Sequence, residues 1–246
     1  MNPVLEEIVK TRRVRPIDGG EGIPVHSEIS EEDGLFLQDL VRKVDPTVTL
    51  EVGLAFGVSA LYICDALRIR EGTRHIAIDP YQRDNDGVWG SWGNGIGIAN
   101  LSRAGFGDIV QVIEKPSHLA LPQLEMARQD VDFAFIDGNH NFDFTLVDFF
   151  YIDHILRVGG VVAFDDAFIP RVKKVLRYIA TNCPYSAIGY SGLEYTNSWK
   201  RRTLEQLMTI IPFCRSNFEL GIRGRCVAFR KERPADEFGR SFYSRF

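Results

Sequence analysis

The feature that most constrains the fold is a regular alternation between short apolar runs and longer segments with helical periodicity. The apolar runs have strand length and read "TVTLEVG", "RHIAID", "IVQVIE", "VDFAFID" and "GGVVAFDD". Helical patterns follow them over residues 58–68, 96–104, 117–128, 142–157 and 170–181. Such alternation is typical of a parallel sheet covered by helices on both faces. The sequence therefore predicts an α/β fold with a doubly wound, mostly parallel sheet.

The flanking segments extend this pattern. Asn2 and Pro3 favour the start of a short leading helix, and Ser30 is a good N-cap for a second helix that ends near Asp45. After the alternation come "YSAIGY", a polar helix over residues 196–210, and "RCVAFRK", which we expect to close one edge of the sheet with an antiparallel strand. We expect an N-terminal helical arm over residues 1–46 and one large domain over residues 47–246.

Composition narrows the possible partners and compartment. The chain has 246 residues, 45% of them apolar, and a formal net charge of -4, which gives no electrostatic case for nucleic acid or an anionic membrane. No apolar run approaches the ~20 residues needed to span a bilayer. The four cysteines lack metal-like spacing and the N-terminus lacks a secretory pattern. We expect a cytoplasmic protein with reduced thiols.

Acidic residues stand at or just past the ends of the predicted strands. In a doubly wound sheet, ligands bind outside the carboxyl ends of the strands, so these positions are candidates for a site. A capping role explains any one of them, but recurrence over five strands favours a shared site. The acids are Glu51, Asp79, Glu114, Asp137, Asp165 and Asp166.

The first strand-to-helix turn, "LEVGLAFGVSA", argues against a dinucleotide. Counting from Gly53 places Ala55 and Val58 where the second and third glycines of a G-x-G-x-x-G fingerprint belong. Asp79, at the end of the next strand, is placed to accept hydrogen bonds from ribose hydroxyls, as carboxylates do in many nucleoside sites. A nucleoside cofactor without a pyrophosphate fits both observations.

Several motifs, taken in order, resemble the class I S-adenosylmethionine-dependent methyltransferases. They are "LEVGLAFGVSAL", "IAIDPYQ", "KPSHLALPQL", "VDFAFIDGNH" and "LRVGGVVAFDD". Within that class the chain is most similar to the metal-dependent O-methyltransferases, namely the catechol O-methyltransferase group and the macrocin- and cephalosporin-tailoring enzymes. The resemblance covers Val48 to about Thr181 and implies a Rossmann-like, seven-stranded domain.

The resemblance also implies roles for individual residues. Glu51, Gly53 and Ser59 would line the methionine end of the cofactor, Asp79 would hold the ribose, and Ser117 would lie near the adenine. Asp137 would contact the cofactor and, with Asp165 and Asp166, bind a divalent metal. Three carboxylates form a hard, oxygen-only ligand set that suits Mg²⁺.

His140 is the expected catalytic base. Catechol methyltransferases resemble this chain except for a lysine at the position of His140 and an asparagine at the position of Asp166. The D-x-x-H spacing from Asp137 is instead similar to the antibiotic-tailoring branch, in which histidine serves as the base. Imidazole titrates near neutrality, so it can accept a proton without a large pKa shift.

We therefore expect an O-methyltransferase that uses S-adenosylmethionine and Mg²⁺ on a small hydroxylated acceptor, such as a natural product, a sugar or a catechol. An NAD-type oxidoreductase and a non-catalytic binding domain of the same fold are the alternatives. The loop with Trp89 and Trp92 is a candidate lid. The apolar leading helix and "RCVAFRK" favour a homodimer.

Overall fold

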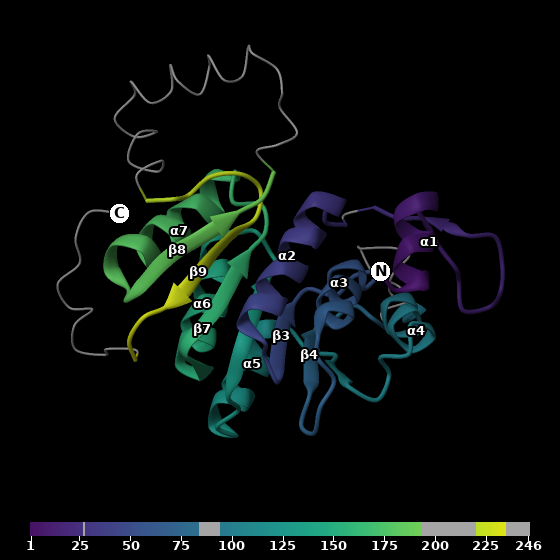
Figure 1. Ribbon diagram of the computed structural model, residues 1–246, viewed down its shortest axis with the longest axis horizontal. Helices are drawn as coiled ribbons and strands as arrows, with labels where there is room; N and C mark the ends of the chain where they lie inside the picture. The colour runs from purple at the N-terminus through teal and green to yellow at the C-terminus, as the bar shows by residue number, and fades with distance from the viewer. Residues whose placement is uncertain (27, 84–93, 193–219, 235–246) are drawn as a thin grey trace, which may run out of the picture.

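A seven-stranded sheet forms the centre of the molecule in the computed structural model, which describes residues 1–26, 28–83, 94–192 and 220–234 (Figure 1). The strand order is β5-β4-β3-β6-β7-β9-β8, and β9 runs antiparallel to both of its neighbours. The strands are β3 (Val48–Val52), β4 (Arg74–Ile78), β5 (Val110–Ile113), β6 (Val131–Ile136), β7 (Leu156–Phe164), β8 (Tyr185–Tyr190) and β9 (Val227–Lys231). The predicted α/β sheet is confirmed, and its order reverses between β3 and β6.

Helices cover both faces of the sheet. Side chains from α1, α2, α3 and α4 share one apolar core with alternate residues of the strands, and side chains from α5, α6 and α7 share the other. Figure 1 shows α1 and α4 near the β4 side of the sheet and α7 near β8. The helices are α1 (Pro3–Thr11), α2 (Glu31–Val44), α3 (Val58–Ala66), α4 (Ile96–Arg103), α5 (Ser117–Met126), α6 (Phe142–Ile155) and α7 (Pro170–Asn182).

Local capping explains where the first two helices begin. The Asn2 side chain accepts a hydrogen bond of 3.0 Å from the amide of Val4, and Pro3 occupies the first turn of α1. Ser30 and Asp33 form a reciprocal capping box at the start of α2. Both helix starts agree with the sequence prediction.

Two features of the ends of the chain differ from expectation. A two-stranded hairpin, β1 (Arg13–Val14) with β2 (Ile23–Pro24), follows α1 and was not predicted, because two-residue strands leave too little periodicity to detect. The segment "RCVAFRK" supplies β9, which pairs with β7 and β8, so β8 is the outermost strand at that end. The prediction that "RCVAFRK" forms the edge strand is therefore wrong, although the strand is antiparallel as expected. The predicted helix over 196–210 lies outside the described residues.

The N-terminal arm packs directly onto the main domain. Leu5, Ile8 and Leu37 lie in the same core as Leu54 of the first strand-to-helix turn, with at most 5% of their surface exposed. The apolar face of α1 is therefore largely covered within one chain, and neither feature that suggested a homodimer leaves an open apolar surface. The homodimer and the domain boundary at residue 46 stay predictions.

Candidate functional site

A cavity of about 910 Å³ opens at the carboxyl ends of β3, β4, β6 and β7. Ligands of doubly wound sheets bind at this position, and pockets for small molecules commonly measure roughly 300–1,000 Å³. All but one of the predicted site residues line it. The lining includes Gly53, Ser59, Asp79, Ser117, Asp137, His140, Asp165 and Asp166.

Glu51 is the predicted residue that does not line the cavity. It lies on β3 with no exposed surface, and its Oε2 accepts a hydrogen bond of 3.0 Å from the hydroxyl of Ser59. Its Oε1 is 3.4 Å from Nε2 of the fully buried His75. Glu51 therefore orients Ser59, which does line the cavity, and its own contact with the cofactor stays a prediction.

Gly53 brings the first strand-to-helix turn against the end of β6. It has φ +94°, a backbone conformation that favours glycine, and a Cβ at this position would stand 2.1 Å from the carbonyl oxygen of Asp137. The Asp137 amide also donates a 2.9 Å hydrogen bond to the carbonyl of Val52. The turn that we expect to hold the cofactor and the strand end that carries Asp137 are thus in direct backbone contact.

Asp79 closes the same turn from β4. Its Oδ2 accepts hydrogen bonds from the amides of Leu54 (3.1 Å) and Ala55 (2.8 Å) and from the side chain of Gln82 (3.1 Å). Its Oδ1 accepts one bond of 2.8 Å, from the amide of Tyr81. Because a carboxylate oxygen has two lone pairs, Oδ1 keeps capacity for a further donor such as a ribose hydroxyl. Asp79 therefore stabilises the turn in addition to its predicted ligand role.

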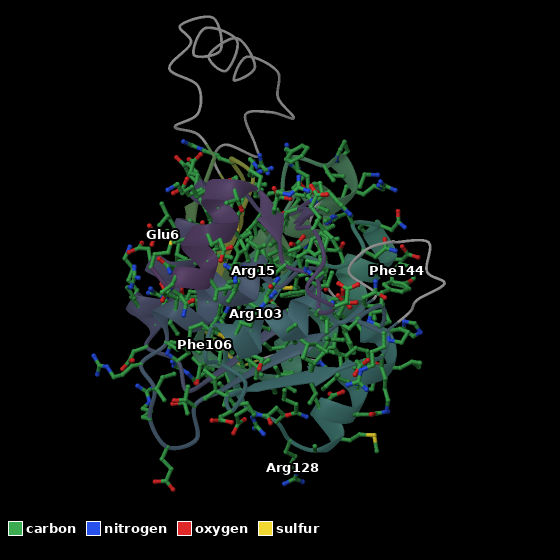
Figure 2. The ribbon with its side chains drawn as sticks, turned by 90° about the vertical axis from the view of Figure 1, so that its right-hand side faces the viewer. Glu6, Arg15, Arg103, Phe106, Arg128 and Phe144 are labelled. Carbon is green, nitrogen blue, oxygen red and sulfur yellow. The ribbon has the colours of Figure 1, made fainter. Side chains whose placement is uncertain are left out.

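Ser117 and the residue after it form another part of the wall. Ser117 is the first residue of α5 and lines the cavity together with His118. The ring of His118 packs edge-on against Phe144, with centroids 6.2 Å apart, and Phe144 lies near the surface of the molecule (Figure 2). This wall is partly aromatic and open to solvent, as suits a planar ligand group.

His140 lies between two of the three predicted metal ligands. Its Nε2 is 3.4 Å from Oδ1 of Asp137, and its Nδ1 is 3.4 Å from Oδ2 of Asp166. Asp165 joins them through its position at the end of β7, where its amide bonds to the carbonyl of Ile136 at 3.0 Å. Asp166 has φ 52°, in the left-handed region that aspartate tolerates better than most residues. The structure therefore brings together four residues that the sequence placed at the ends of two different strands.

Burial and mutual repulsion perturb the ionisation of this cluster. Burial, followed by the charges of Asp165 and Asp166, raises the pKa of Asp137 well above its ordinary value. Burial and the adjacent Asp166 raise the pKa of Asp165 to about 7. Burial lowers the pKa of His140. The negative charge of Asp166 raises this pKa in part, and the positive charge of Arg171 lowers it further. The imidazole is therefore neutral at pH 7 and able to accept a proton.

The three carboxylates have the chemistry of a hard-cation site but are not arranged as one. Among the described residues, no group of three or more His, Cys, Asp or Glu side chains is placed to hold a metal ion. Oδ1 of Asp165 is nevertheless buried without a hydrogen-bond partner there, and burial together with the charges of Asp165 and Asp166 raises the pKa of Asp137. Both are features that a bound cation would relieve.

Sequence reasoning missed several residues around the cavity. Arg171 and Arg225 line it, and Asp148 lies behind its wall, where a Cβ on Gly138 would stand 3.7 Å from Oδ2 of Asp148. Asp148 is 1% exposed, and neither of its carboxylate oxygens has a hydrogen-bond partner among the described residues. An aspartate on the apolar face of a predicted helix was the available signal for Asp148. The arginines carried none, because their contacts are distant in sequence.

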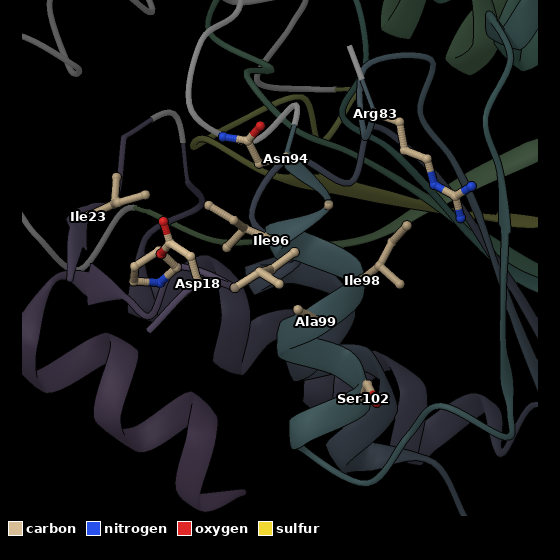
Figure 3. A pocket seen from close by; sticks show the side chains of 11 residues that line it. Asp18, Ile23, Arg83, Asn94, Ile96, Ile98, Ala99 and Ser102 are labelled. Atoms are coloured by element: carbon tan, nitrogen blue, oxygen red, sulfur yellow. The ribbon is translucent and has the colours of Figure 1, made fainter. Parts of the chain in front are cut away.

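A second cavity of about 800 Å³ lies between the N-terminal hairpin and α4 (Figure 3). Ile23 and Asp18 approach it from the hairpin segment, Ile96 and Ala99 from α4, and Arg83 from the loop after β4 (Figure 3). This cavity contains none of the predicted site residues, and residues 84–93, which include both tryptophans of the predicted lid, lie outside the described part of the chain.

The fold and the cavity define a Rossmann-like domain with an acidic small-molecule site at the switch point of its sheet. A family described as "Methyltransferase domain" matches residues 50–167. Tapetum-specific methyltransferase 1 of Arabidopsis thaliana is 29% identical over 147 residues, which are 59% of this chain and 54% of that protein. Caffeoyl-CoA O-methyltransferase of Mesembryanthemum crystallinum is 25% identical over 147 residues, 56% and 50% of the two chains.

A solved structure has the same fold. The O-methyltransferase of Bacillus cereus, in complex with S-adenosylhomocysteine, aligns with a TM-score of 0.59 and 24% identity over 76% of this chain and 83% of that chain. This chain spans about half the length of the curated relatives that it matches. Residues 50–167 therefore match a methyltransferase domain, and the chain is similar to proteins of the caffeoyl-CoA O-methyltransferase group. The resemblance noted in the sequence is thereby confirmed.

Two further observations concern the chain's environment. Within the described ranges, none of the helices combines the length and the apolar character that crossing a bilayer requires. Cys64, Cys183 and Cys226 are free thiols. Burial raises the pKa of Cys64 and of Cys226, so neither is a reactive thiolate at neutral pH.

Proposed function

We propose that the protein is an S-adenosylmethionine-dependent O-methyltransferase that acts on a hydroxyl group of a small molecule, assisted by a divalent cation. The observation that carries this proposal is the position of His140. Its neutral imidazole lies 3.4 Å from both Asp137 and Asp166, at one end of a cavity whose other walls contain Asp79 and Ser117. One cavity is therefore lined by a candidate base, by an acidic cluster and by residues suited to a nucleoside.

The residues present fit the cofactor. Gly53 allows the first turn to pack against the backbone of Asp137, Oδ1 of Asp79 has a free lone pair for a ribose hydroxyl, and Ser117 offers a hydroxyl on the adjacent wall. Asp137 would face the cofactor from the end of β6. The acidic lining also complements a sulfonium cation, which has no phosphate to repel. In this proposal Glu51 acts through Ser59.

The donor set fits a hard divalent cation such as Mg²⁺ in its chemistry. Asp137, Asp165 and Asp166 would hold the cation, because carboxylate oxygens are its preferred ligands and the unpartnered oxygen of Asp165 lies among them. Since no three described side chains already form a ligand set, the proposal requires these carboxylates to reorient when a cation binds.

When bound, S-adenosylmethionine supplies the methyl group and the cation makes an acceptor hydroxyl more acidic. His140 removes the hydroxyl proton, which its lowered pKa allows at neutral pH. Asp137 and Asp166 each lie 3.4 Å from one ring nitrogen, where they would orient the imidazole. The backbone contact between Gly53 and Asp137 sets the cofactor turn and the acceptor end at a constant separation, which favours in-line attack.

Calorimetry and a transfer assay test the proposal. S-Adenosylmethionine should bind and NAD should not, which separates a methyltransferase from an oxidoreductase. Methyl transfer from labelled cofactor to hydroxylated acceptors in a cell extract should stop on chelation, while cofactor binding persists, and return with Mg²⁺. Cofactor binding without transfer to any acceptor would instead favour a non-catalytic domain.

Two substitutions assign the roles within the cluster. His140→Ala should lower the rate by roughly 10²–10⁴-fold with the cofactor still bound, the usual span for the loss of a general base. Asp166→Asn should weaken the affinity for Mg²⁺, and so raise the Mg²⁺ concentration needed for activity, while keeping the side-chain shape. His154→Ala is a matched control, because His154 lies on α6 beside Glu125, outside the cavity lining. Full activity in metal-free enzyme would remove the cation from the proposal.

A further inference from the structure

Arg171 carries its positive charge at the N-terminal end of α7, where a positive charge is unfavourable. It is the second residue of α7, where the helix dipole opposes a positive charge, and there is no acidic residue in that first turn. Its side chain is exposed and lines the cavity, and Nη1 donates a hydrogen bond to the Asn141 side chain, a neutral acceptor one residue after His140. Helix stability therefore gives no reason for an arginine here.

Arg225 approaches the same end of the cavity from the segment before β9. Its Nε is 3.2 Å from Oδ2 of Asp33, a side chain with no exposed surface, and its carbonyl accepts a 2.7 Å hydrogen bond from the amide of Ala167. The Arg225 side chain remains 45% exposed and lines the cavity. The buried carboxylate thus anchors one edge of a guanidinium that is otherwise open to the cavity.

Further hydrogen bonds hold both carboxylate oxygens of Asp33 in place. Its Oδ1 accepts a hydrogen bond from the hydroxyl of Ser191, and its Oδ2 accepts bonds from the amide and hydroxyl of Ser30. Contacts from three separate parts of the chain therefore fix Asp33, and Asp33 fixes Arg225. Such an arrangement reduces the side-chain entropy that the arginine would lose on binding a ligand.

Neutralisation of the acidic cluster does not account for the two arginines. Over the described ranges, neither Arg171 nor Arg225 forms an ion pair within 4.0 Å with Asp137, Asp165 or Asp166. Their guanidinium groups lie near the cluster, since Arg225 lowers the pKa of Asp165 and Arg171 that of His140. Both arginines therefore lie beside the end of the cavity that contains His140, and each guanidinium keeps N–H donors that can bind a ligand.

We propose that Arg171 and Arg225 bind an anionic group of the methyl acceptor, so that the substrate is a hydroxylated carboxylate or phosphate ester rather than a neutral alcohol or phenol. Asp33 is a positioning residue for Arg225. This inference rests on the proposed function only in identifying the bound molecule as the methyl acceptor. Binding of an anion can be measured in the absence of turnover. Guanidinium groups suit carboxylates and phosphates alike, since both accept paired hydrogen bonds.

Matched acid and amide probes test the proposal by calorimetry, in Mg²⁺ buffer, with and without S-adenosylhomocysteine. The probes are 3,4-dihydroxybenzoate against 3,4-dihydroxybenzamide, and glucuronate against glucuronamide, so that each pair differs only in charge. Dihydroxybenzyl phosphate distinguishes phosphate from carboxylate. In at least one pair the acid should bind roughly tenfold or more tightly than its amide, as expected for a charge-assisted hydrogen bond.

Variants locate the preference. Arg171→Gln and Arg225→Gln should each reduce the acid-over-amide ratio, and the double variant should bring it to about one. Arg68→Gln is the control, because Arg68 is exposed at the opposite end of β4 and lies outside the cavity lining. Asp33→Asn should lower the ratio to that of Arg225→Gln, whereas a purely structural Asp33 would change only the thermal midpoint.

The outcomes separate the two proposals. Equal binding of acid and amide in both pairs, absence of binding by every acid, or an acid preference that survives the double variant would overturn the anion site. Binding of S-adenosylhomocysteine in the same preparations would then leave the proposed methyltransferase function standing. An acid preference without any binding of S-adenosylhomocysteine would support the anion site and refute the proposed function.

Discussion

Asp148 should destabilise the folded protein at neutral pH, and replacing it with asparagine should stabilise the protein. Asp148 lies on α6 with 1% of its surface exposed, and its two oxygens lack hydrogen-bond partners among the described residues. Burial raises the pKa of its carboxyl group from 3.8 to about 6, although the nearby Ser117 hydroxyl offsets part of the increase. Asp148→Asn keeps the shape of the side chain and removes its charge.

The shift from 3.8 to about 6 fixes the size of the effect. One pKa unit corresponds to about 1.4 kcal/mol, so ionised Asp148 costs about 3 kcal/mol of unfolding free energy. Because the folded state holds this proton more tightly than the unfolded chain, the cost is absent below about pH 4, grows as the pH rises through the window between the two pKa values, and is complete above about pH 7. At pH 5 about half of it remains.

Urea unfolding of the ligand-free protein at pH 7.5 and pH 5 measures the difference between wild type and Asp148→Asn. The variant should be more stable by up to about 3 kcal/mol at pH 7.5 and by about half of that at pH 5. Asp143→Asn is the matched control, because Asp143 is exposed in the first turn of the same helix. A variant that is less stable than wild type at pH 7.5, or a difference that does not change with pH, would refute the reasoning.

Four further expectations follow from the site and the surface. Gly53→Ala should abolish cofactor binding in calorimetry, because its Cβ would overlap the carbonyl of Asp137, and wild-type affinity would contradict that geometry. Asp79→Ala should weaken S-adenosylmethionine binding by about a hundredfold or more and also lower the thermal midpoint, since its bonds to the turn are lost. Hydrogen exchange across residues 87–97 should slow on cofactor binding if this loop is a lid, and an unchanged rate would argue against one. Light scattering at micromolar concentration tests the homodimer, which a strict monomer would exclude.

The core of the fold was predictable because its signals are local. Each buried strand is a short apolar run and each helix a periodic one, so the alternation alone placed β3, β4, β5, β6 and β7. The carboxyl ends of parallel strands meet at one edge, so the positions of Asp137 and Asp165 in the sequence were enough to predict that they converge. The same rule brought His140 into the cavity, three residues after Asp137.

What could not be predicted depends on contacts between distant residues. The sequence of a strand does not show which strands it will pair with. "RCVAFRK" therefore gave no sign that β9 would insert between β7 and β8. Asp79 is surrounded by amides of a turn about 25 residues earlier, which its position at a strand end does not reveal. Arg225 looks like any surface arginine in the sequence, because the buried Asp33 that anchors it lies near the other end of the chain.

The residues that anchor and form the proposed anion site lie in a different part of the sequence from those proposed for methyl transfer. Every residue assigned to the cofactor, the cation and the base falls between 51 and 166, inside the segment that matches the methyltransferase family. Asp33, Arg171, Ser191 and Arg225 all fall outside that segment. If the two arginines bind the acceptor as proposed, substitutions in the flanking sequence alone should change which acceptor is used and leave the residues proposed for methyl transfer unaltered.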